Sequence, residues 1–281
     1  MIYLISRDAR FSPNSTTRDE TVFKAVVLQF VLRGRAIRTL DESGLPDELP
    51  DAEAVLSMGR SVETLRRLSA WERGGLLVLN APDGLLENSR SRLSELIARS
   101  GVGARYVANE RETATVAERL SFPLWLKRGD ACAQTAGDVR FVTTREELDE
   151  AMTYFMEKGY ADVVAEEHLE GDLIKFYGVE GTEFFRYTYP TDGGFSKFGL
   201  EKHNGTPSFF PFSSHDLKQT ADEIARSSGM LFYGGDAVIG SNGEFSVIDF
   251  NDWPSFGDYA QEAAIAIVER TLSLLQDRSA E

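Results

Sequence analysis

The segment around Asn242-Gly243 constrains the fold of this chain more than any other stretch of its sequence. Apolar runs rich in strand-forming residues flank this dipeptide, and Asn-Gly favours a two-residue type I′ hairpin loop because both residues adopt positive φ there. A hairpin closed by these two residues places Asp236 directly opposite Asp249. Side chains directly across an antiparallel pair share one face, so two like charges at these positions repel each other.

A divalent cation would turn this repulsion into attraction. Asn251 follows Asp249 by two residues and therefore lies on the same face, while its partner Gly234 carries no side chain. Two carboxylates and an amide oxygen suit a hard cation such as Mg²⁺, and Mn²⁺ accepts the same ligands. The alternative is that these residues form the polar outer face of an ordinary hairpin. On the metal hypothesis, Asp249→Asn should remove most turnover and leave the fold intact or slightly more stable, because the repulsion is relieved.

The N-terminal third alternates strand and helix signals, which is typical of a parallel α/β sheet. Apolar residues recur at helical spacing from Val22 to Val31, and Gly34 ends that helix. We expect further helices at 62–72 and 88–100, and strands at 2–6, 36–40, 54–57, 76–80 and 104–108.

The rest of the chain changes to longer strands. We expect strands at 122–127, 137–142 and 161–167, with Thr144 capping a helix that runs up to Gly159. Strands at 173–179 and 183–189 should pair antiparallel about the Glu180-Gly181 turn. A helix at 216–228 should precede the metal hairpin in the sequence, and a helix at 258–277 should follow it. The loop at 190–212 is long for a compact domain, and loops of this length are usually functional.

Composition argues against several classes of protein. The formal net charge of −15 disfavours a nucleic-acid partner. No run reaches about 18 apolar residues and the start shows no secretory signal, so we expect no membrane association. The single Cys132 excludes an internal disulfide framework and fits a reducing compartment, which predicts a cytoplasmic protein.

Three motifs follow one another in an informative order. FPLWLK ends a strand on Lys127, AEEHLEG carries an acidic-x-x-aliphatic pattern from Glu166 to Leu169, and Asp236 precedes the triplet Asp249-Phe250-Asn251. In this order the motifs resemble the ATP-grasp superfamily, over residues 80–259. The resemblance implies the α/β ATP-grasp fold, with an N-terminal parallel α/β pre-ATP-grasp domain at 1–107, an α+β lid at 108–190 and a C-terminal metal- and ATP-binding subdomain at 191–281.

The resemblance also implies an ATP site beneath the lid. Lys127 and Lys175 each lie on a strand from which a fixed ammonium can face the phosphates. The acidic segment 166–169, here called the hinge, would contact the adenine edge through its backbone. The glycine-rich loop of the family is short here, and Arg140 stands where many members carry a second lysine. The nucleotide-binding candidates are Lys127, Arg140, Glu166, Glu167, His168, Leu169, Asp172 and Lys175.

The activity implied by the resemblance is that of an ATP- and Mg²⁺-dependent ligase. Such an enzyme joins a small-molecule or peptide carboxylate to an amine through an acyl phosphate, and it releases ADP and phosphate. Several ligases carry an arginine two residues before the first metal acid, but this chain has Gly234 there. The remaining candidates for catalytic contacts to the substrate are Arg186, Lys202 and Asn204.

The long loop at 190–212 is expected to cover the reacting phosphate. It brings Lys197 and Lys202 among four phenylalanines, which supply charge and bulk to exclude water. Two alternatives to the ligase remain open: a small-molecule kinase similar to the inositol-phosphate kinases of the same fold, and a nucleotide-binding module without turnover.

Overall fold

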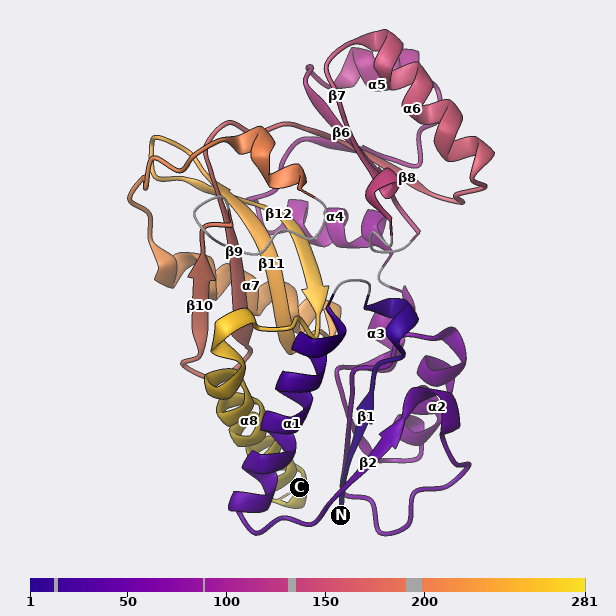
Figure 1. Ribbon diagram of the computed structural model, residues 1–281, viewed down its shortest axis with the longest axis vertical. Helices are drawn as coiled ribbons and strands as arrows, with labels where there is room; N and C mark the ends of the chain where they lie inside the picture. Colours follow the sequence, from indigo (N-terminus) through magenta and orange to yellow (C-terminus); the bar gives the residue numbers. More distant parts are fainter. Residues whose placement is uncertain (13–14, 88, 131–134, 191–198, 281) are drawn as a thin grey trace.

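Three four-stranded sheets organise the chain in this computed structural model, which describes residues 1–12, 15–87, 89–130, 135–190 and 199–280. Figure 1 shows the lid sheet above the other two, with the C-terminal sheet and the N-terminal sheet below it. The expected α/β architecture with a separate α+β lid is therefore confirmed.

The N-terminal sheet is parallel throughout, with the strand order β2-β1-β3-β4. Its central strands β1 and β3 are almost entirely buried, as expected for apolar runs covered on both faces. The strands are β1 (Ile2–Ser6), β2 (Ile37–Asp41), β3 (Ala54–Ser57) and β4 (Leu77–Leu79), and the helices are α1 (Thr16–Leu32), α2 (Val62–Arg73) and α3 (Pro82–Glu87). The next helix, α4 (Arg90–Arg99), contributes Ile97 to the core of the C-terminal sheet instead.

The lid sheet is antiparallel and has the order β5-β8-β6-β7. The strand expected at 104–108 forms its edge instead of joining the N-terminal sheet, because its backbone pairs with β8. Thr144 caps α6 as predicted, since its side chain accepts a hydrogen bond from the Glu147 amide at 3.2 Å. The lid consists of β5 (Tyr106–Ala108), α5 (Thr113–Arg119), β6 (Leu124–Arg128), β7 (Val139–Val142), α6 (Arg145–Glu157) and β8 (Val163–Glu167).

The C-terminal sheet is also antiparallel and has the order β10-β9-β11-β12. The predicted lid range of 108–190 includes β9 and β10, but both strands belong to this sheet because β9 pairs with β11 along its whole length. The elements are β9 (Asp172–Val179), β10 (Phe185–Thr188), η4 (Leu200–Asn204), α7 (Ser214–Ser228), β11 (Phe232–Ile239), β12 (Phe245–Asp252) and α8 (Ala260–Ala280).

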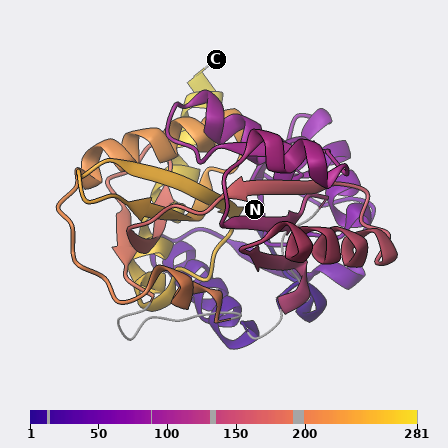
Figure 2. The ribbon, with the colours of Figure 1, turned by 90° about the horizontal axis from the view of Figure 1, so that it is seen from above.

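Helices α1 and α8 join the N-terminal and C-terminal sheets through one shared core. Both helices lie side by side in Figures 1 and 2, and Val26 and Phe30 of α1 belong to the same buried cluster as Ile267 of α8. Phe232 at the start of β11 and Trp253 just after β12 also belong to this cluster.

Within the described ranges, no helix is both long enough and apolar enough to cross a bilayer.

Candidate active site

The β11–β12 hairpin is closed by a different loop from the one that the sequence predicts. Gly240 pairs with Glu244, since the Gly240 amide donates to the Glu244 carbonyl at 2.9 Å, so three residues form the loop. Gly243 occupies the left-handed region with φ of 83°, as its position in a three-residue hairpin loop requires. The predicted two-residue loop is therefore wrong, and the ladder that leaves the turn is shifted by one residue.

A β-bulge restores the predicted register of the acidic residues. Val247 lies opposite Ala237 and Asp249 lies opposite Asp236, which leaves Ile248 as the extra residue of β12. The prediction that Asp236 faces Asp249 is thus confirmed, although it holds because of the bulge. The bulge also has a second effect, because the Ile248 carbonyl accepts a hydrogen bond from Lys127 Nζ at 3.1 Å.

A cavity of about 320 Å³ lies between the lid, the hairpin and the N-terminal sheet. Its volume is within the range of small-molecule sites. Val139 of the lid and Leu173, Val238 and Ile248 of the C-terminal sheet contribute apolar lining. The predicted residues that line it are Lys127, Glu166, Glu167, His168, Leu169, Lys175, Asn204, Asp236, Asp249 and Asn251.

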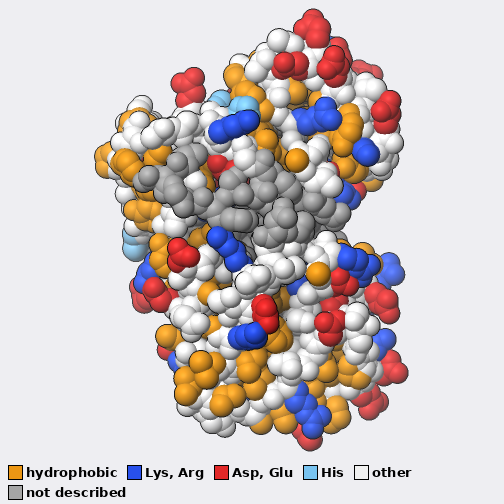
Figure 3. Space-filling model, viewed as in Figure 1, with side chains coloured by type: hydrophobic (Ala, Val, Ile, Leu, Met, Phe, Trp, Pro, Cys, Tyr) orange, Lys and Arg blue, Asp and Glu red, His pale blue; other side chains and the backbone are white. Residues whose placement is uncertain are grey.

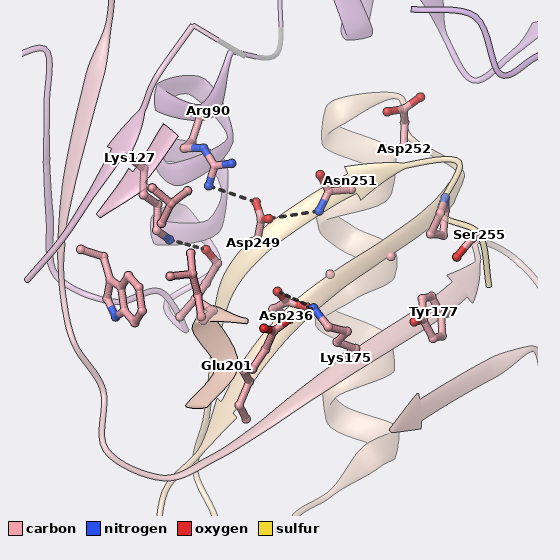
Figure 4. Close-up of a pocket in the computed structure, with 18 of the residues that line it drawn as sticks. Arg90, Lys127, Lys175, Tyr177, Glu201, Asp236, Asp249, Asn251, Asp252 and Ser255 are labelled. Atoms are coloured by element: carbon pink, nitrogen blue, oxygen red, sulfur yellow. Dashed lines mark hydrogen bonds and ion pairs between the residues drawn. The ribbon is translucent and has the colours of Figure 1, made fainter. Parts of the chain in front are cut away.

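Each of the two hairpin carboxylates faces its own cation (Figure 4). Lys175 Nζ lies 3.3 and 3.4 Å from the two carboxylate oxygens of Asp236, its register partner on β11. Arg90 Nη1 lies 3.6 Å from Asp249 Oδ1. The amide nitrogen of Asn251 donates to Asp249 Oδ2 at 3.2 Å, so the side chains of Asn251 and Asp249 converge as the sequence predicts.

These surroundings shift the pKa values of the two carboxylates in opposite directions. Burial raises the pKa of Asp236, and the negative charge of Asp249 adds to this effect against the opposing charge of Lys175. Burial also acts to raise the pKa of Asp249, but Arg90 and Lys127 outweigh it and hold that pKa below its usual range. Asp249 therefore ionises more readily than Asp236, for which the charge of Lys175 does not outweigh burial.

The donor set fits a hard divalent cation. Two carboxylates in paired register and one amide side chain supply oxygen ligands. A cation beside Asp236 would oppose the burial and the charge of Asp249 that raise the pKa of Asp236. In the parts of the chain that the structure covers, no cluster of three or more Asp, Glu, His or Cys side chains is arranged for a metal. Asn251 would supply the third protein ligand of this site, because its side chain lies 3.2 Å from Asp249.

The other end of the cavity carries the predicted hinge. Lys127 is buried and forms an ion pair with Glu166, whose Oε1 also accepts a hydrogen bond from Ser94 Oγ at 3.0 Å. Trp125 Nε1 lies 3.1 Å from His168 Nδ1, which fixes the hinge histidine beside the lid. The buried side chain of Lys127 thus links the hinge residue Glu166 to the Ile248 carbonyl of the hairpin.

Several predicted residues have other roles in the structure. Asp172 anchors the following loop, because its carboxylate accepts hydrogen bonds from the amides of Ser208 at 2.6 Å and Phe210 at 2.8 Å. Glu167 lines the cavity but accepts a hydrogen bond from the Ser121 amide at 2.8 Å.

Three predicted cations lie away from the cavity. Arg140 stacks on the ring of Tyr154 with its guanidinium carbon 3.9 Å from the ring centroid. Arg186 pairs with Glu262 on α8 at 2.5 Å, and Lys202 is exposed. Some residues named from the sequence lie outside the described residues. They are Lys197, Phe195 and Phe198 of the predicted cover at 190–212, and Cys132.

Sequence reasoning missed several charged residues of the cavity, and Arg90 and Glu201 are two of them. Arg90 lies in the first turn of α4, where Ser89 caps the helix, and its side chain is only 10% exposed. A cation in the first turn opposes the helix dipole, so this local conflict was a signal that could have identified it. Glu201 of η4 lines the cavity, with its Oε1 3.2 Å from Lys175 Nζ. The sequence around Glu201 gives no local signal for a place in the cavity, because the residues before it show no regular helix or strand pattern.

The fold is similar to that of solved structures over nearly the whole chain. One is a RimK-domain ATP-grasp protein from Sphaerobacter thermophilus, with a TM-score of 0.65, 15% identity and coverage of 95% of this chain and 98% of that chain. Another is the ATP-grasp ligase PsnB in complex with a minimal precursor, with a TM-score of 0.60, 15% identity and the same coverage of both chains. The sequence matches no protein-family model and no curated protein. The chain therefore has the ATP-grasp fold that its motifs predicted.

Proposed function

We propose that this protein is an ATP- and Mg²⁺-dependent ligase that joins a carboxylate substrate to an amine through an acyl phosphate. The observation that carries the proposal is the meeting of Lys127, Arg90 and Lys175 with the paired acids Asp236 and Asp249 along one cavity. Its similarity in fold to an ATP-grasp ligase supports the same activity. ATP would be one substrate, and a small-molecule or peptide carboxylate and an amine would be the others.

The cavity offers a place for each part of the nucleotide. The adenine would lie between the hinge at 166–169 and the apolar side chains of Leu173 and Ile248. The phosphates would extend past Lys127 and Arg90 toward Lys175, so that three cations face their oxygens. Mg²⁺ held by Asp236, Asp249 and Asn251 would supply further neutralisation of phosphate charge.

The reaction then needs two displacements. A carboxylate oxygen of the substrate attacks the γ-phosphorus, the bond to the bridging β,γ oxygen breaks, and ADP leaves. The amine nitrogen next attacks the acyl carbon, phosphate leaves with the bonding electrons, and the nitrogen loses a proton. Lys175 and Arg90 lie where they can orient the transferred phosphate and stabilise its charge, while the closed lid would keep water from the acyl phosphate.

Hydroxylamine trapping tests this proposal. The protein is incubated with Mg²⁺, ATP, hydroxylamine and each of a set of carboxylates, and we expect a hydroxamate together with ADP for the correct substrate. Asp249→Asn should lower the rate by about 100-fold or more. Asp216→Asn, which removes an exposed carboxylate outside the cavity, is the matched control.

Three results would contradict the ligase. A phosphorylated alcohol recovered as the stable product would assign the protein as a kinase. Tight nucleotide binding with no ADP formed from any substrate would assign it as a binding module. Formation of AMP instead of ADP would also overturn the proposed chemistry.

A further inference from the structure

Glu201 is a carboxylate in the cavity that neither the metal ligands nor the hinge explain. It belongs to the short helix η4, and its side chain is only 12% exposed. Its Oε1 lies 3.2 Å from Lys175 Nζ, on the same ammonium that Asp236 contacts at 3.3 Å (Figure 4). One cation at the inner end of the cavity therefore faces two carboxylates.

The position of Glu201 is held by the neighbouring side chains of η4. Asn204 Nδ2 donates to the Leu169 carbonyl of the hinge at 3.0 Å. The ring of His203 stacks on Phe141 of the lid, with 4.2 Å between ring centroids. Because one side of η4 is tied to the hinge and the lid, Glu201 is directed to Lys175 while Lys202 remains exposed.

The chain changes direction at both ends of η4. Gly199 before it and Gly205 after it have φ of 72° and 71°, a conformation that residues with a side chain rarely adopt. The two glycines let the chain enter and leave the cavity within a few residues.

The contacts of Lys175 indicate what Glu201 does there. The single ammonium of Lys175 lies 3.2 Å from the carboxylate of Glu201 and 3.3 Å from that of Asp236. A cation bound by Asp236 and Asp249 would neutralise Asp236 and leave Glu201 of η4 as the second carboxylate at Lys175. A phosphate that approaches Lys175 would therefore compete with Glu201 for the same ammonium.

We propose that Glu201 occupies the position of the terminal nucleotide phosphate at Lys175 and is a specificity-determining residue that weakens triphosphate binding relative to diphosphate binding. A diphosphate ends before Lys175 and leaves the contact between Glu201 and Lys175 in place, whereas a triphosphate must displace the carboxylate. This inference rests on the proposed function, because it requires the phosphates to follow the path past Lys127 to Lys175.

Nucleotide affinities of three proteins test the inference. The Kd values of Mg²⁺-ADP and of Mg²⁺ with the β,γ-imido analogue of ATP are measured by isothermal titration calorimetry for the wild type, Glu201→Gln and Glu183→Gln. Glu201→Gln keeps the size of the side chain and removes its charge. Glu183→Gln removes an equal charge from an exposed position outside the cavity and serves as the control.

We expect Glu201→Gln to tighten binding of the triphosphate analogue by about tenfold and to change ADP binding by less than about twofold. Glu183→Gln should change neither value. Equal changes for both nucleotides, or weaker binding of the analogue, would overturn the inference and leave the proposed function standing. If the wild type binds neither nucleotide, both the inference and the proposed function are overturned.

Discussion

The lid and the remainder of the molecule, here called the body, are built around different kinds of core. The buried cluster of the lid is drawn entirely from residues 107–165, so its strands and helices cover one another. The main cluster of the body combines Ile2 and Phe30 with Phe232 and Ile267, from opposite ends of the chain. The lid is therefore a local unit, whereas the N-terminal and C-terminal sheets are parts of one unit.

The contacts described between the two regions at the site are mostly polar. Lys127 of the lid donates to the Ile248 carbonyl of the hairpin, and the Arg90 amide of α4 donates to the Gly129 carbonyl at 2.6 Å. Figure 3 shows acidic side chains on the outer end of the lid, away from the body. Polar contacts can be exchanged for contacts with a ligand at little cost, which is the requirement for a lid that opens and closes.

The first way to break this comparison is to remove a large side chain from each core. Trp253→Ala and Phe155→Ala should each cost about 3–5 kcal/mol of local stability, since both side chains are fully buried. Trp253→Ala should lower the unfolding temperature of the whole body, because Trp253 packs against Phe232 within the shared core. Phe155→Ala should give a separate early transition of the lid.

Calorimetry together with hydrogen exchange measures the two transitions. Far-ultraviolet circular dichroism confirms that each variant folds at low temperature. Loss of protection in β1 and β3 of Phe155→Ala at the same temperature as in the lid would show that the two cores unfold together, contrary to the comparison.

A smaller effect separates the two acids of the hairpin. At pH 7 without metal, Asp249→Asn should destabilise the protein by about 1–2 kcal/mol, because it removes the partner of the buried Arg90. Asp236→Asn should be neutral or stabilising, because burial raises the pKa of Asp236 in the folded protein. This expectation differs from the sequence-based one, in which Asp249→Asn leaves the fold intact or slightly more stable, because the structure places cations around Asp249.

The pH dependence gives the sign of each contribution. The pKa of Asp249 is lowered on folding, so its carboxylate stabilises the protein above the unfolded pKa of about 3.9 and loses this effect as the pH falls through the lowered value. The pKa of Asp236 is raised, so its ionised form opposes folding at neutral pH and protonation removes that cost. Urea unfolding at decreasing pH should show Asp236→Asn converging toward the wild type first, because the raised pKa of Asp236 is crossed first. Asp249→Asn should converge only at lower pH, as the lowered pKa of Asp249 is crossed. Parallel curves would contradict these assignments.

The smallest expected effect is a difference in exchange rates. Amides of the lid strands β6 and β8 should exchange faster than those of β1 and β3, because the lid can open without disrupting the body. Mg²⁺ and a non-hydrolysable ATP analogue should slow exchange in the lid more than in the body. Equal protection of the lid with and without nucleotide would count against lid closure on the nucleotide.

Local patterns determined most of the elements and several residues of the candidate site. Alternating strand and helix signals predicted the parallel sheet, and the motifs predicted that Lys127, the hinge at 166–169 and the acids Asp236 and Asp249 meet in one place. These features were readable because each depends on short-range periodicity, turn chemistry or a motif. Asp236 and Asp249 share a face whether the hairpin closes through a two-residue loop or through a longer loop with a bulge.

Tertiary structure alone decided which partners these residues have. A strand pattern does not state which edge it pairs with, so β9 and β10 join the hairpin and β5 joins the lid. The sequence also does not reveal which acidic residue a given cation will contact. In the structure, Arg186 pairs with Glu262 on the surface, while Arg90 reaches Asp249. Pairing of strand edges and of buried charges depends on distances across the folded chain, and these distances are set only when the cores pack.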